Sequence, residues 1–398
     1  MRDRYKEVID AKKPALKELS DTLETELQLW SHPNTNAAIV WEYDPDKNLK
    51  VDPPKAEARV GELFYKGEVS RFGHGLQRSY LFALLIVLSK QSQHGQPTLI
   101  LGCEEPELFQ HPPQLKHLAG VLKKLSEDNA QIIICTHSPI FVDGRSFNDV
   151  RLAQKSITTG EAEILEASLE RVGRLYSEYK GDRLPKELAG VEAKIHASLQ
   201  SKRSEMFFSQ RLILVEGIED EAYLTSYLHL LGYWDDFRKY GASIVPVDAK
   251  SQLLMPLIIA KELRIPTYLI FDADLNEKKA DKLKKHKEDN YALLSACGIE
   301  KPEKETFTDG VFISKGVTVW ETQITDLMEK EIGSEWSIEK TRIEVDYGHT
   351  KNLTKSALFI GDLVIALDKK GKKSGSMISL CRNIYEFLQT GQGISHNK

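Results

Sequence analysis

The chain has 398 residues, a formal net charge of −5, 41% hydrophobic residues and 28% charged residues, as in globular proteins of two or more domains. Because the net charge is negative, overall electrostatic attraction to nucleic acid is excluded, and any such binding would depend on local basic patches. No apolar run is long enough for a membrane span, no signal region precedes the first helix, and four scattered cysteines indicate reduced thiols, so we expect a cytoplasmic protein without a membrane partner.

The first half predicts a charged helix followed by short strands and a second helix. Leucines at positions 16, 19, 23 and 27 recur at helical spacing within residues 1–30, and an apolar helix is expected over residues 79–89. Continuous apolar runs at residues 98–102 and 131–136 predict strands that are buried on both faces. Residues 156–209 are polar and helix-prone, which predicts a connector.

From residue 211 onward, strands and helices alternate. Strands are expected at residues 211–217, 243–249 and 267–274, each followed by a helix, and residues 310–320 are again strand-like. Such alternation predicts an α/β fold with a mostly parallel sheet and helices on its faces.

Two of these strands end in carboxylates. Glu216 ends the first strand, and Asp220 lies in the first turn of the next helix. Asp272 and Asp274 end the third strand, and side chains two residues apart point the same way while the chain stays extended. If the two strands are neighbours, four carboxylates converge on one edge of the sheet, where two Mg²⁺ or Mn²⁺ ions could offset their charge and activate water. The alternative is that these acids only cap helices.

The order of these motifs resembles the Toprim fold, the metal-binding domain of topoisomerases, bacterial primases and certain nucleases. The resemblance rests on "VEGxxD" after one apolar strand and "DAD" after another, with a helix, a strand and a helix between them.

Three motifs in the first half resemble those of ABC ATPases. Glu104 and Glu105 in "EEPELFQHP" follow an apolar strand like a Walker B segment, and His137 in "THSP" matches the switch histidine. The stretch "SRFGHGLQRS", with Gly73 and Gly75, resembles the ABC signature, whose helix N-terminus contacts the γ-phosphate of ATP on a partner subunit. Singly, "GHG" could be a turn and His137 a capping residue; the three motifs together indicate an ABC-type domain.

A phosphate-binding loop of the form GxxxxGK[ST] does not occur in the sequence. We therefore expect this chain to be the C-terminal part of a longer protein. ATP would act as a cofactor only in that full-length protein, and the chain alone should not hydrolyse it.

ABC motifs followed by a Toprim unit are similar to the OLD (overcoming lysogenization defect) family of nucleases. The resemblance implies a partial ABC-type ATPase domain (1–155), a helical connector (156–209), a Toprim domain (210–330) and a mixed C-terminal segment completing the nuclease unit (331–398). It also implies DNA cleavage or nicking with two Mg²⁺ or Mn²⁺ ions, ATPase control, a homodimer in the full-length protein and frequent use in anti-phage defence. Within this family, we expect the chain to belong to the class that is paired with a helicase.

The same resemblance assigns roles to residues. Glu216, Asp220, Asp272, Asp274 and Glu321 would hold the metals, although Glu321 could equally begin a helix. A lysine should stabilise the charge of the transition state; Lys355 is preferred to Lys351, and both could be solvated surface residues. Lysines of two clusters would contact the DNA backbone or simply form solvated faces: Lys278, Lys284, Lys285 and Lys372.

Two other functions remain open from the sequence. One is a non-catalytic, SMC-like ATP-dependent DNA clamp, which would bind DNA without cutting it. The other is a different Toprim enzyme, a primase or a topoisomerase; the ABC half argues against both, and a topoisomerase would form a covalent tyrosine–DNA adduct.

Overall fold

The chain forms two compact units, Met1–Phe141 and Val142–Lys398. The domain boundary expected at residue 155 stays a prediction; the compact units divide earlier in the chain. The computed structural model describes residues 2–30, 34–42, 55–62, 64–91, 99–128, 130–142, 144–155, 160–181, 188–199, 203–299, 307–348 and 353–394.

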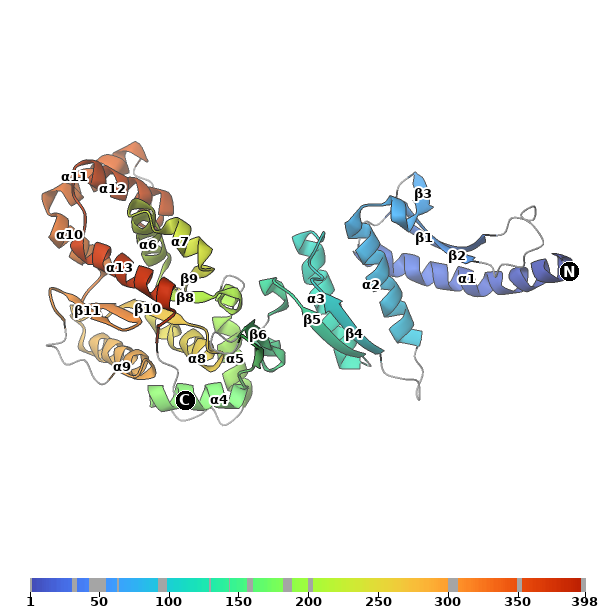
Figure 1. Ribbon diagram of the computed structural model, residues 1–398, viewed down its shortest axis with the longest axis horizontal. Coiled ribbons are helices and arrows are strands. Elements are labelled where there is room, and N and C mark those ends of the chain that lie inside the picture. The colour runs from blue at the N-terminus through green and yellow to red at the C-terminus, as the bar shows by residue number, and fades with distance from the viewer. Residues whose placement is uncertain are drawn as a thin grey trace. The chain divides into compact units, whose positions relative to one another are not determined.

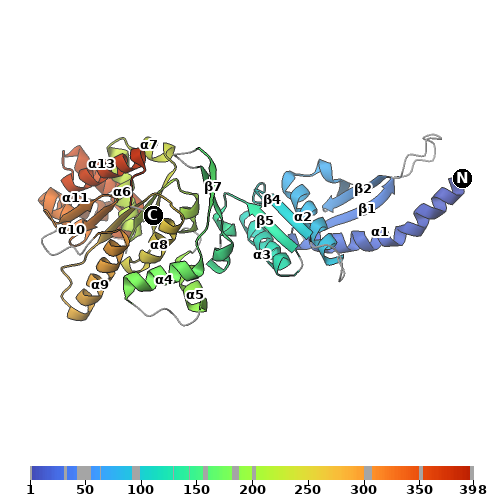
Figure 2. The ribbon, with the colours of Figure 1, turned by 60° about the horizontal axis from the view of Figure 1, so that its bottom comes forward.

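The first unit begins with the expected long helix, α1 (Arg2–Trp30), which runs along an antiparallel sheet (Figure 2). Its leucine stripe explains the packing, because Leu23 and Leu27 are fully buried in one cluster with Ala37 and Val60 of the sheet. The sheet consists of β1 (Thr35–Glu42), β2 (Lys55–Glu62) and β3 (Tyr65–Glu68).

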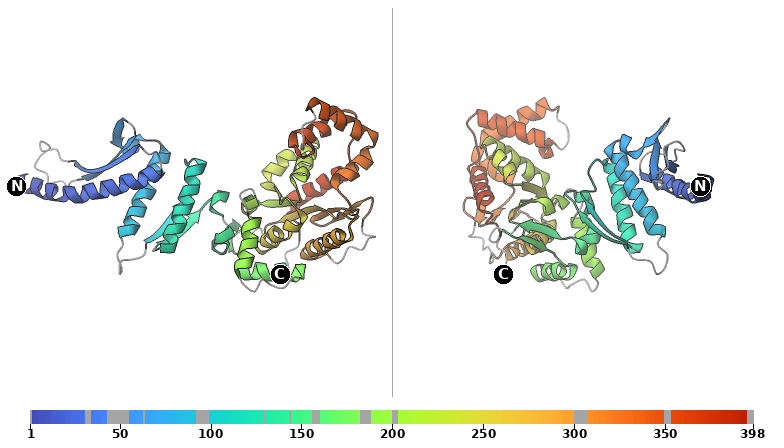
Figure 3. Two further views of the ribbon diagram at one scale, coloured as in Figure 1. Left: turned by 180° about the vertical axis from the view of Figure 1, so that it is seen from behind. Right: turned by 45° about the vertical axis from the view of Figure 1, so that its right-hand side comes forward.

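The rest of the first unit is a parallel pair of strands, β4 (Leu99–Glu104) and β5 (Ala130–Cys135). One face packs against α2 (His74–Gln91) and α3 (Pro112–Asp128) (Figure 3). The other face is open within the described residues, since Ile100 and Ile133 are 67% and 62% exposed. The prediction of strands buried on both faces is therefore wrong here, because the helices of this unit cover one side only. Two short 3₁₀ helices complete the unit, η1 (Val69–Arg71) and η2 (Pro139–Phe141).

The second unit contains a five-stranded sheet in the order β11-β12-β10-β8-β9. Four strands are parallel, which confirms the predicted sheet type: β8 (Arg211–Val215), β9 (Ala242–Pro246), β10 (Thr267–Asp272) and β12 (Val317–Trp320). The segment expected as one strand at 310–320 is a hairpin, in which β11 (Val311–Ser314) turns back onto β12. Gly316 makes the turn possible: its φ is +77°, and a Cβ there would lie 2.6 Å from the Ile394 nitrogen.

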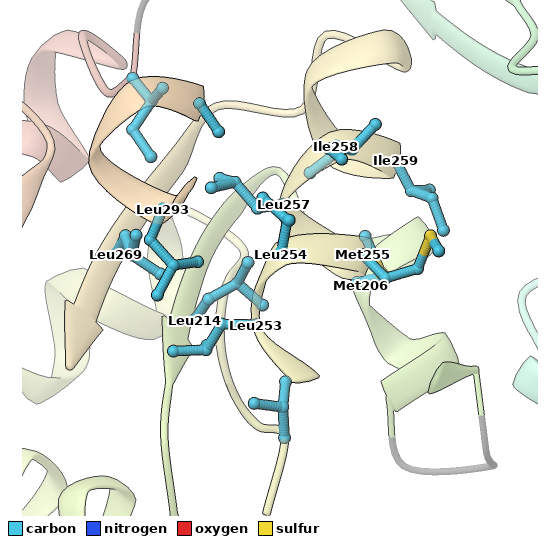
Figure 4. Packing of buried hydrophobic residues seen from close by; sticks show 14 of the residues in the cluster. Met206, Leu214, Leu253, Leu254, Met255, Leu257, Ile258, Ile259, Leu269 and Leu293 are labelled. Atoms are coloured by element: carbon cyan, nitrogen blue, oxygen red, sulfur yellow. The ribbon is translucent and has the colours of Figure 1, made fainter. Parts of the chain in front are cut away.

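Helices cover both faces of this sheet, as Figure 1 shows. On one face, Leu214 of β8 and Leu269 of β10 meet Leu253, Leu254 and Leu257 (Figure 4). The helices of that face are α4 (Leu169–Lys180), α5 (Leu188–Ser198), α8 (Leu254–Glu262) and α9 (Ala280–Ala296). The opposite face carries α6 (Ile218–Leu230), α7 (Trp234–Lys239), α10 (Ile324–Ile332), α11 (Ser334–Asp346), α12 (Ala357–Lys369) and α13 (Gly375–Thr390).

The helix-prone segment 156–209 is more than a polar link. Its helices α4 and α5 bury Val172, Val191 and Ile195 in the same core as α8 and α9. Small elements complete the unit: β6 (Leu152–Lys155), β7 (Ala162–Leu165), η3 (Gly144–Asp149), η4 (Arg203–Phe208), η5 (Lys250–Gln252) and η7 (Leu353–Lys355). Within the described ranges, the structure holds no helix with the length and apolarity that crossing a bilayer requires.

The central strand should dominate the stability of the second unit. Leu269 is completely buried, so Leu269→Ala should lower the free energy of unfolding by about 2–5 kcal/mol. Leu358, which is 73% exposed, provides the matched control, and Leu358→Ala should change stability by less than about 0.5 kcal/mol. Urea denaturation of the whole chain measures both; equal effects would contradict the assigned packing.

Candidate active site with buried carboxylates

Glu216 and Asp220 lie at the turn between β8 and α6. Residues 212–215 of β8 are buried, and Glu216 is the first residue beyond the strand. Gly217 precedes the first residue of α6, and its N–H donates to Asp220 Oδ2 at 2.8 Å. Asp220 is only 8% exposed. The local sequence thus folds one carboxylate back beneath the turn while the other ends the strand.

Asp272 and Asp274 follow the neighbouring strand. β10 pairs in parallel with β8, with Leu269 opposite Leu214, so the carboxyl ends of both strands meet at one edge of the sheet. The predicted adjacency of the two acidic strands is confirmed. The condition for a common direction of the two aspartates is not met, because Asp274 has a φ of +53° and the chain has left the extended conformation there.

The four carboxylates act on one another electrostatically. Burial raises the pKa of Asp220 to about 7, and the charges of Glu216 and Glu219 add to the effect. Burial also raises the pKa of Asp272 well above its ordinary value, and repulsion by Asp220, Glu216 and Asp274 adds to that rise. The site therefore concentrates negative charge in a place that water reaches poorly.

A lysine that the sequence reasoning missed lies among these acids. Lys250 is 4% exposed, and its Nζ donates to Asp272 O and Asp274 Oδ2, each at 2.6 Å. Burial raises the pKa of Glu216, and the Lys250 charge lowers it. The sequence did offer a signal for Lys250. It lies in "PVDAKS", shortly after the second parallel strand, and therefore at the same edge of the sheet as the acids.

The residues fit hard divalent cations in chemical type. Glu216 Oε2 and Asp272 Oδ1 are buried and have no hydrogen-bond partner among the described residues, and carboxylate oxygens are the ligands that Mg²⁺ prefers. Within the described ranges, no three acidic, histidine or cysteine side chains are already arranged as ligands. Asp220 is engaged by the Gly217 N–H and Asp274 by Lys250, and the Glu216 carboxylate interacts with the backbone of Asp272 and Lys250.

Glu321 and Lys355 differ in their relation to this edge. Glu321 follows β12, and its carbonyl accepts from Leu275 N at 3.0 Å, which places its backbone beside the residue after Asp274. Lys355 ends η7 and is exposed; the cation whose charge acts on Glu216 and Asp272 is Lys250. Lys351 lies outside the described residues.

The predicted DNA-binding lysines lie in two places. Lys278, Lys284 and Lys285 are exposed on or just before α9, and this helix borders the acids because His286 Nδ1 is 3.2 Å from Asp274 Oδ2. Lys372 is exposed in the turn between α12 and α13. There Ser374 N donates to the Tyr227 hydroxyl, and Tyr227 is nine residues along α6, about 14 Å from the helix start that carries Asp220. Lys372 therefore lies near the C-terminal end of α6, opposite the end that carries Asp220.

The ATPase-like motifs meet within the first unit. Glu104 ends β4, Glu105 follows it, and His137 follows β5, so that His137 Nε2 lies 3.7 Å from Glu105 Oε1. Glu105 N donates to Cys135 O at 2.7 Å, which ties the two strand ends together.

The glycine-rich start of α2 contacts the same loop. A Cβ on Gly75 would lie 2.7 Å from Phe109 O, so this close approach requires glycine. Gln110 Nε2 donates to Gly75 O at 3.3 Å, and Arg78 donates to Glu105 O. Gly73 precedes α2 and has open space beside it. The unit thus brings the signature-like turn, Glu105 and His137 into one region.

Comparison with known proteins follows the same division. An AAA ATPase domain model matches residues 2–142, and an "Overcoming lysogenization defect protein-like, TOPRIM domain" model matches residues 207–274, which contain the four carboxylates and Lys250. The chain is 27% identical over 214 residues to the Old nuclease of Escherichia phage P2, covering 52% of this chain and 34% of that protein.

Two further relatives show similar identity. The OLD nuclease of Thermus scotoductus is 26% identical over 261 residues, covering 62% of this chain and 46% of that protein. Endonuclease GajA of Bacillus cereus is 28% identical over 208 residues, covering 48% of this chain and 28% of that protein. The chain thus spans less than half the length of each of these curated relatives.

The raised pKa of Asp220 predicts how stability depends on pH. In the metal-free folded protein this carboxyl keeps its proton up to about pH 7, whereas an unfolded aspartate loses it near pH 4. The folded state therefore binds more protons between these values, and stability should fall as pH rises from about 4 to about 7.

Asp220→Asn should flatten this dependence, because its amide oxygen can still accept from Gly217 N and carries no charge. Relative to the parent, the variant should gain at most a few kcal/mol at pH 8, since one pKa unit corresponds to about 1.4 kcal/mol, and only about 1.4 kcal/mol at pH 5, about one unit above the pKa of an unfolded aspartate. Thermal unfolding with a chelator present measures the difference, and exposed Asp235→Asn is the control. A parent whose stability rises across this window would contradict the assignment.

Proposed function

The chain belongs to the OLD family, with an ATPase-like domain followed by a TOPRIM domain, and on this premise we propose that it is a metal-dependent DNA endonuclease or nickase. The observation that carries the proposal is the pair of buried carboxylate oxygens without partners, on Glu216 and Asp272, at adjoining strand ends. Nuclease names among the relatives support the same reaction class.

Glu216 and Asp272 are the residues that would hold divalent metal, with Asp220, Asp274 and Glu321 as the further carboxylates of the site. Bound Mg²⁺ or Mn²⁺, as a pair, would supply Lewis-acid stabilisation of the attacking and leaving oxygens of a phosphodiester. The chain's own part is to keep these acids at one sheet edge and to limit the access of water to them. Lys355 remains the proposed lysine for transition-state charge on family resemblance alone.

The ATPase-like unit is proposed to control access to this site in a longer protein that carries a phosphate-binding loop. Glu104, Glu105, His137, Gly73 and Gly75 would then contribute to ATP sites shared by two subunits of a homodimer. A helicase partner is proposed on the family resemblance alone.

Isosteric removal of charge tests the catalytic proposal. Glu216→Gln and Asp272→Asn should each lower Mg²⁺- or Mn²⁺-dependent nicking of supercoiled plasmid by more than about 100-fold, since even changes behind the ligands cost 10–100-fold. Glu386→Gln removes an exposed carboxylate from α13 and serves as the matched control. Thermal unfolding checks that the variants fold. Cleavage at the parental rate in both would sink the assignment, and DNA binding without any cleavage by the parent would favour the clamp.

The lysines of α9 provide a separate test of DNA binding. Replacing Lys284 and Lys285 together by glutamine should weaken binding of duplex DNA about equally for all sequences and reduce the slope of log K against log salt by about 2. The matched control replaces Arg238 and Lys239, an exposed basic pair on α7. Fluorescence anisotropy between 50 and 200 mM salt, a range within which such contacts respond strongly, distinguishes the two pairs. Identical slopes for both double variants would remove α9 from the DNA-binding surface.

A further inference from the structure

We propose that Lys250 is an internal counter-ion, which holds the acidic site together before metal binds and whose ammonium is displaced from Asp274 when a divalent ion enters. This inference rests on the proposed metal-dependent function and assigns to Lys250 a positioning role that none of the sequence motifs indicated.

The contacts of Lys250 are those of a bound cation. Its ammonium is almost completely buried and donates to Asp272 O and Asp274 Oδ2, both at 2.6 Å. A buried lysine is rare unless it is paired, and here the pairing is with the most acidic region of the unit. Its charge acts on Glu216 and Asp272 as well as on Asp274.

The loop that carries Lys250 is held by contacts beyond the acidic site, in addition to the backbone interaction of Lys250 with Glu216. Asp248 has a φ of +70°, and Arg203 donates both to its carboxylate and to Gln252 Oε1, the latter at 2.7 Å. Val247 N donates to Val215 O at 3.2 Å, and Leu253 N donates to Lys250 O at 3.0 Å. These loop contacts do not involve the ammonium, so the four-carbon side chain can change rotamer without breaking them.

Ammonium and metal compete for the same oxygen. Asp274 Oδ2 accepts from Lys250 and also lies 3.2 Å from His286 Nδ1. By contrast, Glu216 Oε2 and Asp272 Oδ1 are without partners. A divalent ion can first engage these two open oxygens, and its charge then repels the ammonium next to Asp274. Displacing the Lys250 ammonium thus lowers the observed affinity for metal below its intrinsic value.

The decisive variant is Lys250→Met, which removes the charge and keeps an unbranched apolar side chain. We expect the Kd for Mn²⁺, measured by calorimetry on the metal-free chain, to fall by about tenfold or more, which corresponds to about 1.4 kcal/mol. Without metal the variant should melt at a lower temperature than the parent, because buried carboxylates lose their counter-charge. Saturating Mn²⁺ should raise its melting temperature more than that of the parent.

Lys261→Met is the matched control. Lys261 is a partly buried lysine on α8 whose ammonium donates to Ala296 O, away from the acids. Its replacement should leave the Kd for Mn²⁺ unchanged, so that a general loss of stability cannot imitate the effect. If Lys250→Met folds only after Mn²⁺ is added, that behaviour supports the proposal. If it does not fold at all, Lys250→Gln, which keeps hydrogen-bond donors without the charge, is measured in the same way.

The outcomes separate this inference from the proposed function. A parent that binds Mn²⁺ and nicks DNA, together with a Lys250 variant of equal or weaker Mn²⁺ affinity, would overturn the displacement alone. A parent that binds no Mn²⁺ would overturn both.

Discussion

Repulsion among buried carboxylates is the constraint on which this part of the molecule depends. The parallel pairing of β8 with β10 brings Glu216 and Asp272 to the same edge, and the turn into α6 adds Asp220 beneath them. Helices on both faces then limit the access of water. Charge that would be screened at an open surface is therefore poorly screened here, which raises the pKa values of Asp220 and Asp272 and favours the pairing of Asp274 with Lys250.

The two cores explain why the strands cannot separate to relieve this repulsion. Alternate residues of each strand enter opposite clusters: Leu212 and Leu214 pack on one side of β8, and Ile213 and Val215 on the other. Parting the strand ends would expose apolar side chains on both faces at about 25 cal/mol for each Å². The packing of the sheet thus keeps the carboxylates close together despite their mutual repulsion.

The sequence predicted what depends on local pattern. The apolar runs of β8 and β10 and the acids after them follow from the sequence pattern, whereas the adjacency of the two strands entered only as a condition that the strand pairing meets. Other features depend on tertiary contacts between segments that are distant in the sequence. The chain leaves the extended conformation at Asp274, and Asn290 of α9, seventeen residues after Ala273, donates to the Ala273 carbonyl. Lys250 starts beyond β9 and reaches across the end of β8 to that of β10, which only the strand order β9-β8-β10 reveals.

The Lys250 ammonium bears on whether folding of the second unit depends on metal binding. A site made only of acids would tend to couple folding to metal, as structural zinc sites do, because the apo state would leave its charges uncompensated. Lys250 gives the buried acids one counter-charge that belongs to the chain itself, paired with Asp274. Glu216 Oε2 and Asp272 Oδ1 are buried and without hydrogen-bond partners in the described part of the chain, while Asp274 Oδ2 is paired with the ammonium. On the proposed displacement, folding and metal binding are separate steps, and moving one lysine lowers the net free energy gained in the second.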